Sequence, residues 1–275
     1  MKTATAKAAS FFLCLTAIIL VLALPSSAQL IGSDARVIFL FDEDGGDTAK
    51  DFSGNGNDGD IRNAPDWVDG KFGTALELNG KDNVVVVEAP NDLPTGASPR
   101  TVCFWFKWKD AVWPDALYEM MGYGQNAPGQ RLGLGLLETA WNSLGIETVL
   151  FARNFEWDAD TEWHHFATTY PEGETESGKF NIYLDGVLQD AISRHDAQQL
   201  DTMGFPLVVG ALPDPQLFHF PGTMDEVAIF GEELNVDEIN AIMNSGLEAA
   251  TAQQRVAVDS AGKIAISWGK LKTTK

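Results

Sequence analysis

Short apolar runs separated by Gly, Pro, Asn and Asp follow one another along most of the chain. In Arg100–Lys109, the residues Val102, Phe104 and Phe106 alternate with neighbours of the opposite face, as they do in a strand with one buried side. Short runs rich in Val, Phe, Trp and Thr are typical of antiparallel sandwiches and barrels. The pattern therefore predicts an all-β fold. Further strands are expected at 36–42, 83–88, 131–137, 144–152, 162–170, 179–189, 205–210 and 223–230.

A hairpin is predicted at Asp185-Gly186, which stands between the apolar runs Asn181–Leu184 and Val187–Gln189. A two-residue type I′ turn needs positive φ at both central positions, and Asp and Gly tolerate that conformation.

One segment carries a helical pattern, close to the C-terminus. Asn235 can accept hydrogen bonds from the first turn, and Glu238 three residues later completes a capping box. Gly246 supplies a stop signal. The apolar residues that share one face of this helix are Ile239, Ile242 and Met243.

The N-terminal residues 1–28 have the pattern of a secretory signal peptide. Lys2 and Lys7 precede the apolar run Phe11–Leu24, and small residues lead to a cleavage site after Ala28. The run is shorter than the ~20 residues that cross a bilayer, so no membrane span is expected after cleavage. The protein is therefore expected to be secreted, or to reside in the periplasm or at the cell surface.

The remainder is expected to form one domain over residues 33–247, because no repeat or low-complexity linker interrupts it. Residues 248–275 differ: a small polar stretch precedes an alternating segment at 256–268 and a lysine-containing end. A flexible tail and an edge hairpin both remain open for this part.

Charge and cysteine content limit the function. The formal net charge of −20 disfavours nucleic-acid binding, because such a surface repels phosphate backbones. Cys103 is the single cysteine left after cleavage at Ala28, since Cys14 lies in the apolar run. An internal disulfide is thus excluded, and stability must come from the core, with or without a metal ion.

Several short motifs occur in an order that resembles the laminin G-like family of concanavalin A-like lectins and glucanases, of the bacterial secreted type. The resemblance covers residues 36–247. It implies a two-sheet antiparallel jelly-roll sandwich with one short C-terminal helix. Glycan-binding modules, adhesion modules, calcium lectins and glycosidases share this sandwich, so the fold alone does not fix the function. The motifs are Phe41–Asp44, Asp51–Gly59, Trp67, Gly70–Gly80, Thr101–Trp105, Glu162–Ala167, Tyr183–Gly186 and Phe220–Phe230.

A structural Ca²⁺ ion is expected near the loop that follows Asp51. Calcium takes six to eight oxygen ligands, and Asp51, Asn55 and Asn57 alternate with residues that permit a tight turn. The resemblance suggests that Asp225 meets this loop, with Asp42 and Asp44 as further candidates. The alternative is a Gly/Asn turn without metal.

Tryptophans in polar surroundings are the candidate ligand contacts. Trp113, Trp141 and Trp157 lie in loop-like segments, where a flat ring beside Asn or Asp suits a sugar or a protein ligand. Trp105 and Trp163 lie on strongly strand-like segments and are expected to be packed. The adjacent histidines of Trp163-His164-His165 should face opposite sides of a strand, which favours structural packing over metal binding.

These features predict a secreted binding module for a glycan or an extracellular protein, serving carbohydrate binding or cell adhesion, and not an enzyme. The alternative from another class is a glycoside hydrolase that uses Glu156, Asp158 and Glu162, which share the parity of one strand. A non-catalytic surface assembly protein is the third reading.

Overall fold

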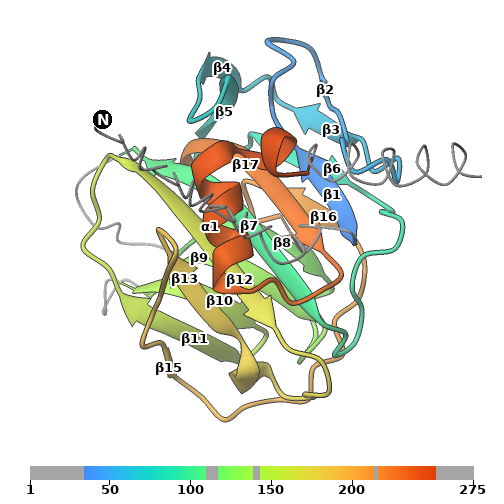
Figure 1. The fold of residues 1–275 in the computed structure, drawn as a ribbon, viewed down its shortest axis with the longest axis vertical. Coiled ribbons are helices and arrows are strands. Elements are labelled where there is room, and N and C mark those ends of the chain that lie inside the picture. The colour runs from blue at the N-terminus through green and yellow to red at the C-terminus, as the bar shows by residue number, and fades with distance from the viewer. Residues whose placement is uncertain (1–33, 110–116, 139–142, 214–215, 252–275) are drawn as a thin grey trace, which may run out of the picture.

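The computed structural model describes residues 34–109, 117–138, 143–213 and 216–251. Within them the chain forms two antiparallel sheets that pack as a jelly-roll sandwich, as predicted (Figure 1). The predicted signal peptide and all but the first four residues of the 248–275 segment lie outside the described residues. Residues 248–251 lie in a short helical turn after the main helix.

Sheet I has the strand order β14-β13-β12-β7-β17-β5-β4, and β1 pairs with β17 in addition. Its strands are β1 (Ala35–Phe39), β4 (Asp66–Asp69), β5 (Thr74–Asn79), β7 (Arg100–Trp108), β12 (Trp163–Tyr170), β13 (Asn181–Leu184), β14 (Val187–Leu188) and β17 (Pro221–Phe230).

Sheet II has the order β15-β11-β10-β9-β8-β16-β6-β3-β2. A single 3₁₀ turn, η1 (Ser177–Lys179), precedes β13 within the described residues. The strands of sheet II are β2 (Thr48–Ala49), β3 (Gly59–Arg62), β6 (Val84–Val87), β8 (Tyr118–Gly124), β9 (Arg131–Glu138), β10 (Ser143–Thr148), β11 (Phe151–Glu156), β15 (Ile192–Ser193) and β16 (Leu207–Val209).

The main core lies between the two sheets and follows the period of two. Phe104 and Phe106 of β7 are fully buried in it, together with Leu134 of β9 and Ile146 of β10. Each such side chain contributes roughly 1.5–3 kcal/mol relative to an exposed one. The alternation of β7 predicted from the sequence is confirmed, because Val102, Phe104 and Phe106 belong to this core while Cys103 does not.

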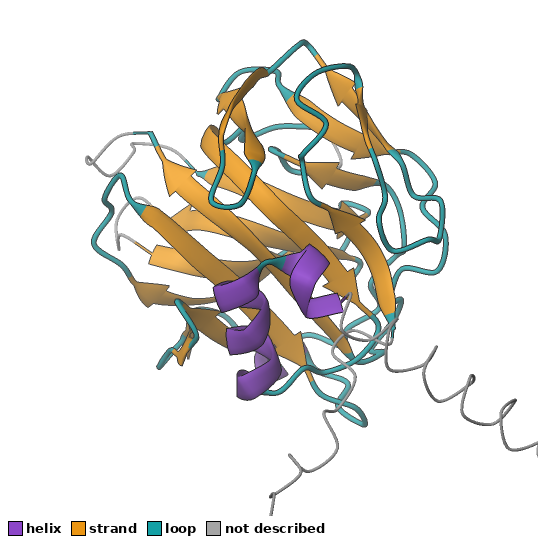
Figure 2. Cartoon of the chain, turned by 45° about the horizontal axis from the view of Figure 1, so that its top comes forward, coloured by secondary structure: helices purple, strands orange, loops and turns teal. Residues whose placement is uncertain are grey.

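The helix α1 (Val236–Ser245) covers part of the outer face of sheet I (Figure 2). The predicted capping box is present: the Asn235 side chain accepts from the first turn, and the Glu238 carboxylate accepts from the Asn235 N–H. Ile239 and Ile242 pack over Cys103 and Ala167 in a second, smaller core. Helix and sheet together bury the cysteine, which raises the pKa of its thiol.

Three rows of neighbouring side chains cross the outer face of sheet I. Ala167, Cys103 and Ala228 form the first row, and it lies in the cluster beneath α1. The other two rows are His165–Trp105–Asp225 and Trp163–Lys107–Thr223–Glu77. The face therefore changes from apolar and covered at one end to polar and open at the other.

The two adjacent histidines face opposite sides of β12, as predicted. His165 is 1% exposed and packs edge-on against Trp105, with ring centroids 5.3 Å apart. Burial lowers its pKa from 6.5 to about 4. His164 instead bonds Asp185 at 2.8 Å and Asp160 at 3.0 Å. The hydrogen bond to Asp185 raises the pKa of His164. His164 therefore gains a proton at a higher pH than an ordinary histidine, whereas His165 gains one only at a lower pH.

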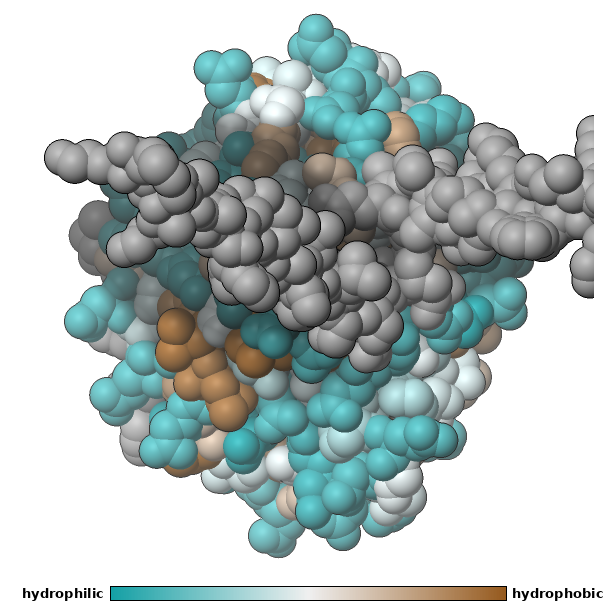
Figure 3. All heavy atoms as spheres, viewed as in Figure 1, coloured by the Kyte–Doolittle hydropathy of each residue, from teal (hydrophilic) through white to brown (hydrophobic). Residues whose placement is uncertain are grey.

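The predicted hairpin at Asp185-Gly186 is confirmed, with φ of 50° and 75° at its two central residues. It leads to β14, whose Val187 and Leu188 are 62% and 57% exposed. The face viewed in Figure 3 is mostly hydrophilic, with an apolar patch near β13. Among the described residues, no helix is long and apolar enough to cross a membrane.

The capping box of α1 should contribute measurably to the free energy of unfolding. Replacing Asn235 with Ala removes the side-chain acceptor of the first helical turn, so we expect a loss of about 1 kcal/mol in the free energy of unfolding. Urea unfolding of the N235A variant measures it. Asn244→Ala, in the last turn of the same helix, serves as the control and should leave the unfolding midpoint close to that of the unsubstituted protein.

The buried His165 should make the protein sensitive to acid. Its folded pKa lies below its unfolded value, so its contribution is present above about pH 6.5 and is lost as the pH falls towards 4. The integrated loss is on the order of 3 kcal/mol. Unfolding free energies measured between pH 7 and 4 should therefore fall less steeply in the His165→Gln variant.

His164→Gln is the matched comparison, and its effect should have the opposite sign. The folded pKa of His164 is raised, so its contribution is present below the unfolded pKa and is lost as the pH rises through the folded one. This variant should lose stability mainly at acid pH. An unchanged acid slope in the His165→Gln variant would contradict the assignment of a neutral, buried ring.

Candidate functional site

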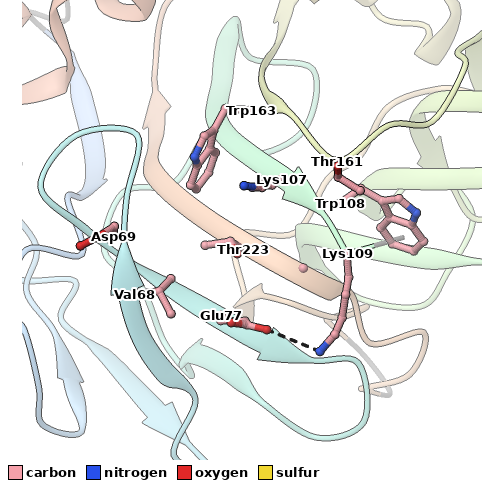
Figure 4. Close-up of a pocket in the computed structure, with 10 residues that line it drawn as sticks. Val68, Asp69, Glu77, Lys107, Trp108, Lys109, Thr161, Trp163 and Thr223 are labelled. Atoms are coloured by element: carbon pink, nitrogen blue, oxygen red, sulfur yellow. Dashed lines mark hydrogen bonds and ion pairs between the residues drawn. The ribbon is translucent and has the colours of Figure 1, made fainter. Parts of the chain in front are cut away.

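An open groove of about 430 Å³ lies on the outer face of sheet I, beyond the part that α1 covers (Figure 4). This volume is within the range of small-ligand sites, about 300–1,000 Å³. Strands β12, β7, β17, β5 and β4 contribute to it. The lining residues are Val68, Asp69, Glu77, Lys107, Trp108, Lys109, Thr161, Trp163, Gly222 and Thr223.

The centre of the groove is the row Trp163–Lys107–Thr223–Glu77, in which each residue is the cross-strand neighbour of the next. Cβ atoms of such pairs are about 4.5–5.5 Å apart. Figure 4 shows the Trp163 indole directed towards the groove beside Lys107, with Thr223 and Glu77 beyond it. The row thus combines an aromatic surface, a cation, a hydroxyl and a carboxylate.

The two lysines of the groove differ in their pairing. Lys109 Nζ lies 3.4 Å from Glu77 Oε1, and both side chains are well exposed, so the pair contributes little to stability. Lys107 makes neither an ion pair nor a side-chain hydrogen bond within the described residues. A partly buried ammonium is therefore available to a ligand at the centre of the row.

Beside the groove, the row His165–Trp105–Asp225 is buried and incompletely hydrogen-bonded. Both ring nitrogens of His165, the indole nitrogen of Trp105 and Oδ1 of Asp225 lack a partner among the described residues. The turn between β4 and β5 covers this row. Lys71 Nζ lies 4.1 Å from the Trp105 ring centroid, and the Phe72 ring meets the same indole edge-on.

Asp225 fixes this turn. Its Oδ2 accepts hydrogen bonds from the backbone N–H groups of Lys71 at 2.8 Å and Phe72 at 3.0 Å. A Cβ at Gly70 would lie 2.7 Å from the same oxygen, so this position requires glycine. Because the turn joins β4 to β5, the Asp225 carboxylate also fixes the wall of the groove that carries Val68 and Glu77.

Asp42 holds the other end of the turn, through a 2.8 Å hydrogen bond from Thr74 N to its Oδ1. Burial raises the pKa of Asp225 to about 7, and the charge of Asp42 adds to the rise. Burial likewise raises the pKa of Glu226 to about 8. Asp42, Asp225 and Glu226 thus form an acidic region in which a cation would relieve charge repulsion.

The loop after Asp51 does not have the geometry that the sequence suggested for calcium. Asp51 Oδ1 accepts from the backbone N–H groups of Ile38 and Ser53, and Oδ2 accepts from Ser53 Oγ and Asn57 N. The amide groups of Asn55 and Asn57 donate to backbone carbonyls. Since hydrogen-bond donors already occupy the carboxylate, these three residues stabilise a turn and do not fit a metal site.

Asp225 does not join that loop in its hydrogen bonds, because its Oδ2 is committed to the 71–72 turn. Within the described residues, no group of three or more His, Cys, Asp or Glu side chains has an arrangement that could hold a metal ion. Oδ1 of Asp225 is fully buried and has no hydrogen-bond partner among the described residues, so this carboxylate oxygen is free to act as a metal ligand.

The tryptophans are distributed differently from the prediction. Trp157 is 7% exposed and packs against Phe106 and His164, so its assignment as a ligand contact is wrong: a stacking ligand needs an exposed ring face. Trp113 and Trp141 lie outside the described residues. Trp163, expected to be packed, is only partly buried and lines the groove. The neighbouring strand registers, unknown from sequence, decide this exposure.

The acids proposed for glycoside hydrolysis do not share a strand. Glu156 ends β11, whereas Asp158 and Glu162 lie in the following loop, and all three are exposed. These residues therefore lack the side-by-side placement that one strand would give them.

A different glutamate pair is present on sheet II. Glu119 is buried, and its pKa is raised by that burial and by the charge of Glu147, which pairs with Arg131. Glycine at 133 leaves room for it, because a Cβ there would lie 2.8 Å from Glu119 Oε2. Within the described residues Glu119 Oε2 has no hydrogen-bond partner, while Glu147 is paired with Arg131. No sequence motif signals this pair, since its members are far apart along the chain.

Solved structures with this fold include three binding domains. Domain 4 of AbnA, a GH43 extracellular arabinanase from Geobacillus stearothermophilus, in complex with arabinotriose, aligns with a TM-score of 0.55 and 16% identity over 77% of this chain and 98% of that one. The binding domain of Paraclostridial Mosquitocidal Protein 1 has a TM-score of 0.57 and 16% identity over 78% of this chain.

The binding domain of botulinum neurotoxin DC in complex with SialylT has a TM-score of 0.55 and 16% identity over 78% of this chain. This chain spans about half of each toxin domain, 53% and 52% respectively. At these identities the likeness concerns the fold. No curated protein matches the sequence significantly.

Residues 79–240 match the family described as the concanavalin A-like lectin/glucanases superfamily. This match covers more than half of the chain and includes β7, β12 and β17, the strands that carry the central row of the groove. The chain therefore belongs to the concanavalin A-like lectin/glucanase superfamily.

Proposed function

We propose that the protein is an exported, non-catalytic binding module that holds a carbohydrate in the groove on sheet I. The observation that carries this proposal is the partly exposed Trp163 ring beside Lys107, Thr223 and Glu77 in one cross-strand row. A sugar has an apolar face that stacks on an indole, and hydroxyl groups that bond to the polar neighbours. An arabinanase domain of the same fold, solved in complex with arabinotriose, supports it.

Export is proposed from the sequence of residues 1–28, with cleavage near Ala28. An extracellular, periplasmic or cell-surface location fits a module that meets glycans outside the cytoplasm. Adhesion to an extracellular protein is the alternative form of this binding function. For catalysis, the exposed Glu156–Glu162 segment does not present its carboxylates side by side on one strand.

We further propose a Ca²⁺ ion bound by Asp225 Oδ1, with Asp42 as the second carboxylate ligand. Asp225 is fully buried, its Oδ1 has no partner in the described part of the chain, and the charge of Asp42 acts on it. Calcium commonly completes its shell with carbonyl oxygens and water. When bound, such an ion would neutralise the two carboxylates and tighten the Gly70–Thr74 turn.

The carbohydrate proposal is tested on a glycan array with purified residues 29–275. We expect selective binding that falls at least tenfold in the Trp163→Ala variant, a change of about 1.4 kcal/mol, because the stacking surface is lost. Phe52→Ala, an exposed aromatic outside the groove, should leave binding unchanged. Binding of no glycan by a folded protein would overturn the proposal in favour of a protein ligand.

The calcium proposal is tested by thermal unfolding with calcium and after chelation. Calcium at 100 times its Kd contributes ~2.7 kcal/mol, which raises the melting temperature by about 5–10 °C. The Asp225→Asn variant should lose this increment. Asp51→Asn should be less stable in both buffers because it weakens the hydrogen bonds of its own turn, yet it should retain the increment. Loss of the increment in the Asp51 variant alone would restore the site suggested by the sequence.

A further inference from the structure

Lysine is placed unusually at the groove of this acidic protein. Acidic residues outnumber basic ones 39 to 19. Nevertheless Lys107 and Lys109 line the groove together with the partly exposed Trp163, and Lys71 lies in the adjoining turn over the buried indole of Trp105. Two of these lysines have an identified role: Lys71 covers the Trp105 ring, and Lys109 pairs with Glu77.

Lys107 has no such role within the described residues. It lies between Trp163 and Thr223 in the register of the sheet, and no side-chain carboxylate pairs with it. An ammonium without a counterion in a groove can form a charge-assisted hydrogen bond with a ligand that carries the opposite charge. Its place beside the stacking ring means that a sugar on Trp163 would bring its substituents within reach of Nζ.

Resting on the function proposed above, we infer that the groove selects an acidic saccharide, a glycan carrying an isolated carboxylate of the uronic or sialic acid kind. Trp163 stacks on the sugar ring, Lys107 Nζ pairs with the carboxylate, and Thr223 bonds a ring hydroxyl. One unpaired ammonium matches one negative charge.

The surroundings of the groove argue against more highly charged ligands. Phosphate and sulfate groups are commonly recognised by arginine forks or helix N-termini, and neither lines this groove. Asp69 and Glu77 lie in the same lining and would repel closely spaced anions, as would the net charge of −20. The two acids instead suit neutral hydroxyl groups, for which they act as hydrogen-bond acceptors.

The test compares each acid with its own neutral ester. Methyl galacturonoside and 3′-sialyllactose, each as the free acid and as the methyl ester of its carboxyl group, are titrated calorimetrically into residues 29–275 at low and high salt. We expect the free acid of at least one pair to bind at least tenfold more tightly than its ester. The preference should weaken as salt rises, because salt screens the pair.

Two variants of one residue separate charge from fold. Lys107→Gln should make acid and ester bind equally, while Lys107→Arg should keep the preference, and both should melt close to the unsubstituted protein because the side chain is partly exposed. Lys81→Gln, an exposed lysine outside the groove, is the matched control and should keep the preference.

The outcomes also distinguish this inference from the proposed function. Binding that needs Trp163 but treats acid and ester alike would leave the carbohydrate module standing and overturn the acidic ligand. A preference that survives Lys107→Gln would likewise overturn the role of Lys107. Absence of binding for every saccharide, on the array and in titration, would overturn both.

Discussion

The arrangement of this protein depends on the buried carboxylate of Asp225 at a bulge in β17. Residues 221–224 pair with β5 and residues 227–230 pair with β1, while β7 pairs along the other side of the strand. The register shifts between Asp225 and Ala228, and Glu226 there has a φ of 53°. Asp225 turns outward to hold the 71–72 backbone, and Glu226 accepts from the N–H of Leu247 just after α1.

The carboxylates of Asp225 and Glu226 thereby attach the Lys71–Phe72 turn and the C-terminal end of α1 to sheet I. The helix closes the apolar end of the outer face, and the Lys71–Phe72 turn closes the middle, which leaves the third row exposed. The groove therefore lies where neither α1 nor the Lys71–Phe72 turn extends over Trp163 and Lys107. Burying the Asp225 carboxylate is unfavourable unless its oxygens have hydrogen-bond partners. The Lys71 and Phe72 N–H groups are such partners, and these bonds also fix the wall of the groove.

The core and the groove lie on opposite sides of sheet I. Phe104 and Phe106 of the core and Lys107 of the groove alternate along β7, and the core residue Trp108 also lines the groove. The same fold at 16% identity occurs in an arabinanase domain solved in complex with arabinotriose, so the sandwich keeps its shape while most of its residues differ.

Because period, turn chemistry and capping act over a few residues, the sequence alone predicted the Asp-Gly hairpin, the capped helix, the two faces of β7 and β12 and many of the strands. It did not predict β3, β4, β5 or β8, and it joined β10 and the start of β11 into one strand at 144–152. It could not determine the site. The partners of the Asp51 carboxylate, a metal ion or backbone N–H groups, depend on which strands become neighbours. The exposure of Trp157 and Trp163 depends likewise on the register of these strands. Only the tertiary structure brings Trp163, Lys107, Thr223 and Glu77 into one row, since these residues lie far apart along the chain and are joined by cross-strand pairing alone.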